Sequence, residues 1–147
     1  MEMDILDPPV GFAPHDRKSP LTDPWEPLYS RKAEGAVVIG LEAGPAHTNS
    51  RGFVHGGLIS ALADNAMGLS CGRALEGGPS LVTVTLAVDF LGAAAIGQWI
   101  EVTPRVARAG STLCFAEATV TADGEPCARA HATFRVVRRA VREPTSG

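Results

Sequence analysis

The sequence lacks an excess of positive charge, the spacing of a metal site and an even set of cysteines, and each absence excludes a class of protein. Its 16 acidic side chains outnumber the 13 basic ones, and the net charge of −3 gives no electrostatic basis for binding nucleic acid. The four histidines show no ligand spacing, so we expect no metal. The three cysteines, Cys71, Cys114 and Cys127, lie in apolar segments, which predicts buried, reduced thiols.

The N-terminus also lacks the cationic start and apolar run of a signal peptide. The apolar stretch of residues 58–75 contains Asp64, Asn65 and two serines, whose transfer into hydrocarbon is costly. We therefore expect a cytoplasmic protein that does not engage a membrane. The length of 147 residues fits one domain with a core large enough to fold unaided.

Prolines exclude a single helix in the first 34 residues, because proline lacks the backbone N–H and clashes with the preceding turn. They are Pro8, Pro9, Pro14, Pro20, Pro24 and Pro27. Apolar side chains such as Trp25 and Leu28 would anchor this segment to the rest of the chain. We expect an N-terminal arm over residues 1–34, made of turns and a short helical piece, that packs on the domain without contributing to the chemistry.

The remaining pattern predicts one strand, one long helix and then four strands. Residues 36–41 form a short β-type run, and residues 56–74 are rich in Ala, Gly, Leu and Ser up to a Gly-Gly-Pro stop. After that stop the apolar period changes to two, with Val82, Val84, Leu86, Val88 and Phe90 on one face of the first strand. The predicted strands, in an antiparallel meander, cover residues 80–90, 99–108, 112–122 and 127–138.

Individual residues predict where this sheet has an edge or a bulge, where it has a hairpin, and how closely it packs on the helix. Pro104 implies an edge or a bulge within its strand, and Asp123-Gly124 predicts a hairpin before the last strand. Small residues in the helix, and a row of alanines in the last strand, let a sheet close tightly around a helix. We expect an α+β domain over residues 35–138, followed by a polar tail over residues 139–147.

Three parts of the central stretch carry the chemistry: Asn49, the corner His55-Gly56-Gly57, and Asp64 in the middle of the predicted helix. The glycines open the helix, where backbone N–H groups lack partners and the dipole is positive, so they could hold an oxyanion. The alternative is a tight turn without chemistry. Asp64 could be a general base that activates water or a nucleophile that forms an anhydride; the alternative is a buried acid bonded to a neighbouring group.

This spacing, followed by four strands, resembles that of the hotdog-fold thioesterases of the phenylacetate-degradation (PaaI-like) type over residues 35–138. The resemblance implies a hotdog fold, in which an antiparallel β-sheet wraps around one long central α-helix. It also implies hydrolysis of acyl-CoA thioesters by paired subunits, without metal or bound cofactor. The family's acid matches Asp64, its helix-start glycine matches Gly56, its polar loop residue matches Asn49, and a hydroxyl residue that is Ser in some members matches Thr83.

The separation of Asp64 from Gly56 predicts a dimer. Eight residues of helix span about 12 Å, whereas a base and an oxyanion donor must both lie within about 3 Å of the reacting atoms. One chain therefore cannot easily supply both groups. We expect a homodimer with two composite sites, each pairing Asn49, His55 and Gly56 of one subunit with Asp64 and Thr83 of the partner subunit. Exposed sheet faces favour further pairing of dimers into a tetramer.

Neighbouring residues have expected roles of their own. His55 should fix the loop through a structural hydrogen bond, because a helix N-terminus disfavours the protonated form that a base would need. Asn49 could orient the attacking water, bind the thioester oxygen or cap the loop. Gly57, Arg108 and Ser111 are candidates for substrate binding. Arginines such as Arg108 could meet the phosphates of coenzyme A or form a solvated face.

The sequence also offers alternatives to hydrolysis at Asp64. Gly68-Leu69-Ser70-Cys71-Gly72 matches the G-x-S-x-G pattern of serine hydrolases, but that motif requires a strained turn between a strand and a helix, and here it lies inside the helix. The main alternative is a binding module of the same fold that holds an acyl thioester without cleaving it. A hydratase of the same fold ranks lower, because its expected Asp-to-His spacing is missing.

Overall fold

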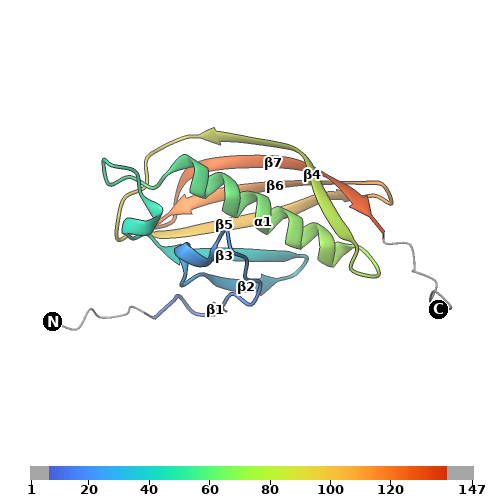
Figure 1. The fold of residues 1–147 in the computed structure, drawn as a ribbon, viewed down its shortest axis with the longest axis horizontal. Helices are drawn as coiled ribbons and strands as arrows, with labels where there is room; N and C mark the ends of the chain where they lie inside the picture. The colour runs from blue at the N-terminus through green and yellow to red at the C-terminus, as the bar shows by residue number, and fades with distance from the viewer. Residues whose placement is uncertain (1–6, 139–147) are drawn as a thin grey trace, which may run out of the picture.

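In the computed structural model, which describes residues 7–138, one long helix lies across a seven-stranded antiparallel sheet (Figure 1). The helix is α1 (Gly56–Ala74), and two 3-10 turns are η1 (Asp23–Trp25) and η2 (Pro45–His47). The strands are β1 (Ala13–Pro14), β2 (Tyr29–Ala33), β3 (Ala36–Glu42), β4 (Ser80–Phe90), β5 (Trp99–Ala109), β6 (Leu113–Ala122) and β7 (Glu125–Val137). This arrangement confirms the expected hotdog fold. No helix in this part of the chain is both long enough and apolar enough to cross a bilayer.

The core lies between α1 and the sheet, and small side chains allow the close approach. Leu62, Ala63 and Met67 of α1 are almost completely buried, as are the alanines of β7. Ser70, the serine of the G-x-S-x-G match, is also fully buried. Its hydroxyl donates to the carbonyl of Ala66 at 2.7 Å and accepts from the N–H of Val37 at 3.0 Å, so it links α1 to β3. These bonds give Ser70 a structural role.

The order of the strands corrects the predicted meander. The sheet runs β1-β2-β3-β5-β6-β7-β4, so β5, β6 and β7 follow one another but β4 pairs with β7 at the far edge. Apolar alternation specifies the faces of a strand and not its neighbours, which is why the sequence could not place β4. Two further strands, β1 and β2, come from the proline-rich arm and extend the opposite edge.

The two local predictions for the sheet are confirmed. Pro104 lies just past Val102, the last residue of β5 that pairs with β3, so its missing N–H faces an edge. A bulge follows between Val106 and Arg108. The hairpin between β6 and β7 turns through Asp123 and Gly124, whose φ angles of 48° and 84° are those that a tight two-residue hairpin requires.

The cysteines are buried and free, as expected. Cys71 of α1 and Cys114 of β6 lie close enough to interact, and burial is the main cause that raises the pKa of Cys71. Burial also raises the pKa of Cys127. Cys71 and Cys127 therefore stay protonated at neutral pH and carry no reactive thiolate.

Candidate active site

The corner at the start of α1 leaves one backbone donor free. His55 caps the helix: its Nδ1 accepts from the N–H of Gly57 at 2.7 Å, and its carbonyl accepts from the N–H groups of Leu58 and Ile59 at 3.1 and 3.2 Å. Three of the four N–H groups of the first turn are therefore satisfied. The fourth, on Gly56, has no partner within residues 7–138. It is the donor that could meet a substrate oxygen.

The bond to Gly57 also fixes the tautomer of His55. Because Nδ1 accepts a hydrogen bond, the proton of the neutral imidazole lies on Nε2. The side chain is exposed, so this Nε2–H group can donate to a ligand. The backbone N–H of His55 donates to the carbonyl of His47 at 2.9 Å, which holds the corner against the preceding loop. His55 therefore combines the expected structural bond with a free donor.

Asn49 uses its side-chain oxygen within the loop. Oδ1 accepts from the backbone N–H of Arg51 at 2.9 Å and of Phe53 at 3.2 Å, and the Asn49 backbone pairs with Phe53. These contacts form a tight turn that includes Gly52, whose φ of 80° favours glycine. The side-chain NH₂ group is left to act on a ligand as a donor. Among the roles expected for Asn49, capping the loop and donating to a thioester oxygen are compatible with this geometry.

Asp64 lies at mid-helix and bonds to the first strand after the helix. The Thr83 hydroxyl donates to Oδ1 of Asp64 at 2.8 Å. Asp64 is half-buried in the chain, and within residues 7–138 its carboxylate bonds to Thr83 rather than to a backbone group or an arginine. Thr83 faces the helix because a bulge between Thr83 and Thr85 shifts the alternation of β4. Bulges often re-aim a side chain beside an active site.

The two halves of the candidate site lie apart in one chain. Gly56 rests against the ring of Phe90, so close that an added Cβ would lie 2.9 Å from Cζ. Asp64 bonds to Thr83. Thr83 and Phe90 occupy opposite ends of β4, so the free amide and the carboxylate are at opposite ends of the same strand.

A groove of about 840 Å³ contains Asp64 and Thr83. It runs along the outer face of α1 toward Arg73 and is closed on one side by the start of β4. Arg108 and Ser111 do not line it; they lie at the hairpin between β5 and β6. Gly57 has its N–H committed to His55. The structure thus joins Asp64 to Thr83 and His55 to Gly57, but leaves Arg108 and Ser111 away from both pairs.

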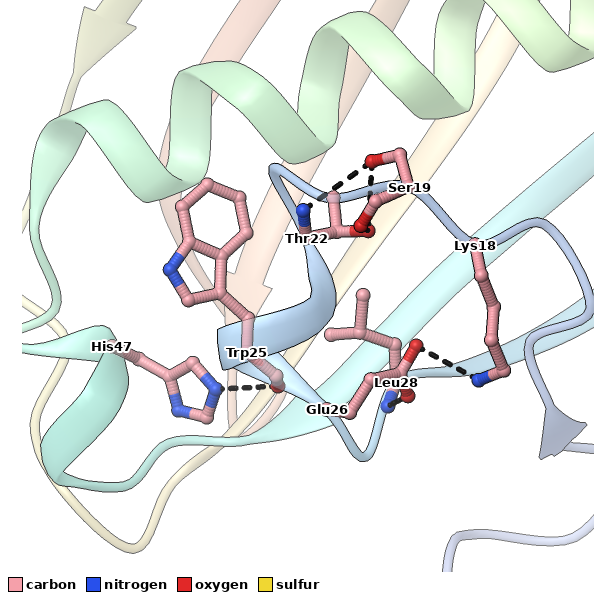
Figure 2. Close-up of polar contacts among 7 residues, drawn as sticks. All are labelled: Lys18, Ser19, Thr22, Trp25, Glu26, Leu28 and His47. Atoms are coloured by element: carbon pink, nitrogen blue, oxygen red, sulfur yellow. Dashed lines mark hydrogen bonds and ion pairs between the residues drawn. The ribbon is translucent and has the colours of Figure 1, made fainter.

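The groove includes arm residues that sequence reasoning assigned no chemistry, among them His15 and Arg17. Figure 2 shows how the arm is held in place. Nε2 of His47 bonds to the carbonyl of Trp25 at 2.8 Å, while Nδ1 of His47 accepts from the N–H of Gly44 at 2.9 Å. His47 thereby ties the arm to the loop that leads into the corner. No local pattern in the sequence indicates this contact, because it joins residues 22 positions apart.

A sheet wrapped around one helix, with a free amide at the helix start and a carboxylate at its middle, defines the class of hotdog thioesterases. Comparisons with known proteins agree with this class. The family model described as "Thioesterase superfamily" matches residues 51–128. The chain therefore belongs to the thioesterase superfamily, and it is a thioester hydrolase.

Individual relatives and one solved structure support this assignment. PA0474 of Pseudomonas aeruginosa, named as a candidate esterase, is 36% identical over 133 residues, which cover 90% of this chain and 99% of that one. Human acyl-coenzyme A thioesterase 13 is 34% identical over 91 residues, covering 60% of this chain and 63% of the human one. A candidate thioesterase from Ralstonia eutropha, described as related to phenylacetic acid degradation, superposes with a TM-score of 0.71 at 27% identity, covering 82% of this chain and 92% of the other.

Proposed function

We propose that the protein hydrolyses an acyl or aryl-acyl coenzyme A thioester to the carboxylic acid and free coenzyme A, at a site shared between two copies of the chain. One observation carries the proposal: within residues 7–138, the free N–H of Gly56 and the carboxylate of Asp64 lie at opposite ends of a strand whose outer edge pairs with no other strand. The human relative named as an acyl-coenzyme A thioesterase supports the choice of substrate class.

The outer edge of β4 supports association with a second copy. This strand of 11 residues ends the sheet, and Val82 and Val84 on it are 54% and 59% exposed. Phe90 and Leu91, at the end of the strand, are similarly exposed. A long, apolar, unpaired edge is a template for pairing with another strand, and natural proteins usually cover or charge such an edge. A second β4 would cover it.

Antiparallel pairing of β4 with its copy would assemble the two half-sites. In such a pair the start of one strand lies beside the end of the other. The Thr83 end carries Asp64, and the Phe90 end carries Gly56. Self-pairing therefore brings Asp64 of one subunit toward Gly56 of the partner subunit, and the two-fold axis produces two equivalent sites.

The chemistry follows from the donors and the acceptor. The thioester oxygen would accept from the N–H of Gly56, with Asn49 and His55 as further donors, so that negative charge developing on it is stabilised. Asp64 would either take a proton from water as that water attacks, or attack the carbonyl itself to form an anhydride that water then opens. Thr83 holds the carboxylate in position. Both routes release coenzyme A as the thiol and leave the acyl group as an acid.

Thiol release from a panel of acyl-CoAs tests the activity, with Asp64→Asn as the matched variant. We expect Asp64→Asn to lose activity by at least about 100-fold, because neither route runs without the carboxylate. Full activity in that variant would exclude Asp64. Tight binding of an acyl-CoA without any release by the native protein would favour a binding module.

Mixing subunits tests the shared site. Asp64→Asn chains would be combined with chains whose corner is inactive, such as Gly56→Pro. If sites are shared, each mixed dimer keeps one intact site, and random mixing restores about a quarter of the native activity. If each chain has a complete site of its own, mixing restores none. This outcome depends on the arrangement of the residues and not on the substrate.

Four broader expectations belong to the same proposal. We propose a cytoplasmic location, and the division into an arm (1–34), a domain (35–138) and a tail (139–147), of which residues 1–6 and 139–147 lie outside the described part. Leu113, Phe115 and Val137 are partly exposed on the sheet face away from α1, which supports pairing of dimers into a tetramer. Arg108, Ser111 and Gly57 stay predicted substrate contacts.

A further inference from the structure

The N-terminal arm forms one wall of the groove that contains Asp64. The arm contributes residues between His15 and Thr22, α1 contributes its outer face from Asp64 to Arg73, and the start of β4 closes the other side. The arm is an ordered wall. Ser19 and Thr22 form a hydrogen-bonded turn against the helix, and His47 holds the carbonyl of Trp25, as Figure 2 shows.

The lining of the groove changes from apolar to positively charged with distance from Asp64. Between Asp64 and Arg73, Gly68 and Gly72 keep the helix face low, and Leu69, Leu81 and Phe134 add apolar surface to the groove. Arg73 lies nine residues beyond Asp64, which is about 13 Å along a helix. An extended acyl group would therefore run over glycines and apolar side chains before it reaches a cation.

Two of the cations in this groove are uncompensated. Lys18 is paired with Glu26 at 3.1 Å. Within residues 7–138, by contrast, neither Arg17 nor Arg73 lies within ion-pair distance of a carboxylate. Asp64 is the one acidic residue among the described residues of the lining, and the proposed function assigns it to the reacting carbon. The far part of the groove is thus positively charged although the whole chain has a net charge of −3.

His15 adds an unfilled hydrogen-bonding group to the same wall. His15 is 5% exposed and lines the groove, and its Nδ1 is buried without a hydrogen-bond partner among residues 7–138. Buried polar groups of native proteins almost always have partners, so an orphaned nitrogen beside a cavity suggests a ligand. Burial lowers the pKa of His15, so the imidazole is neutral at pH 7 and offers a hydrogen bond rather than a charge.

We propose that the arm selects, through Arg17 with Arg73 in the same groove, a substrate that carries a second anionic group beyond the thioester. This inference rests on the proposed function, because it assumes that the thioester lies at Asp64. The anion has two possible sources, the terminal carboxylate of a dicarboxylic acyl group or a phosphate of coenzyme A. A guanidinium recognises both in the same way. An adipyl chain together with an arginine side chain spans roughly the distance from Asp64 to Arg73.

Four thioesters and two variants separate these sources. Adipyl and hexanoyl groups, which differ in the terminal carboxylate, would each be carried on coenzyme A and on N-acetylcysteamine, which has no phosphate. The variant is Arg17→Ala. The control is Lys32→Ala, which removes an exposed cation of β2 that pairs with Asp16 at 3.8 Å and does not line the groove.

We expect Arg17→Ala to lower kcat/KM by about tenfold or more, the size of one charge-assisted hydrogen bond, and Lys32→Ala to change nothing. Loss confined to the two adipyl thioesters identifies the acyl carboxylate. Loss confined to the two coenzyme A thioesters identifies a phosphate. Native-like rates on all four substrates, or an equal loss on all four, would overturn the proposal.

A different result is expected if the proposed function itself is wrong. If the native protein releases thiol from none of the four substrates, hydrolysis at this site is wrong. Calorimetric titration of the same uncleaved thioesters into the native protein and Arg17→Ala then tests the anion recognition by itself. A difference in affinity that follows the carboxylate or the phosphate supports it, and equal affinities refute it.

Discussion

Gly56→Pro is the sharpest test of the oxyanion donor, because it removes one N–H group and leaves the helix start intact. Gly56 is the first residue of α1, where proline is favoured, and its N–H has no partner to lose within the described residues. The preceding residue, His55, has φ −68° and ψ 134°, a conformation that a following proline accepts. Gly56→Ala is the matched control. Both variants place a Cβ near the exposed ring of Phe90, but alanine keeps the N–H.

The expected size of the effect comes from the chemistry of such donors. Loss of one oxyanion-hole donor costs about 2.7–4 kcal/mol, or roughly 10²–10³-fold in kcat. We expect that decrease in Gly56→Pro relative to Gly56→Ala at saturating acyl-CoA, measured by thiol release. Melting temperatures of the two variants should agree, since no backbone hydrogen bond is lost. If both variants fold and their kcat values agree within about threefold, Gly56 is not the donor.

Four further predictions concern Thr83, the edge of β4, the cysteines and His15. Thr83→Val should lower kcat by about 10–100-fold, because a hydrogen bond to a carboxylate contributes about 1.5–3 kcal/mol, whereas Thr83→Ser should not, and Thr85→Val, beyond the bulge, is the control. Val84→Lys should give an inactive monomer in sedimentation velocity, because it charges the exposed edge of β4; an active monomer would refute the shared site. The three cysteines should react with a thiol reagent at pH 8 only after denaturation; rapid labelling of Cys71 in the native protein would contradict its burial. Burial lowers the pKa of His15 below 6.5, so the unfolded chain binds a proton there that the folded chain does not. Urea midpoints should therefore fall as pH drops below about 6.5, and His15→Gln should weaken that dependence.

The helix and its corner could be predicted because their signals are local. Gly56 to Ala74 forms the helix that composition and the Gly-Gly-Pro stop predicted, and His55 makes the structural bond expected of it. The wall contributed by the arm could not be predicted, because it depends on a bond between His47 and Trp25 that no periodicity encodes. Arg17 stands in a proline-rich segment, and only the fold brings it into the groove that contains Asp64.

Strand β4 shows a different limit of the sequence. Its apolar residues at even positions predicted one continuous face, with Thr83 on the other. The bulge between Thr83 and Thr85 divides that face, so that Leu86 is turned toward α1 with Thr83, while Val82 pairs with the exposed Arg135 on the outer side. An alternating pattern cannot reveal this change, because the residues on both sides of the bulge are apolar although they face opposite sides of the sheet. Leu86 and Val88, after the bulge, pack against the core, whereas Val82 and Val84 stay exposed at the edge where we propose that a second copy pairs. A pattern that looks like one buried face can therefore be two surfaces, and the site residue Thr83 lies where they meet.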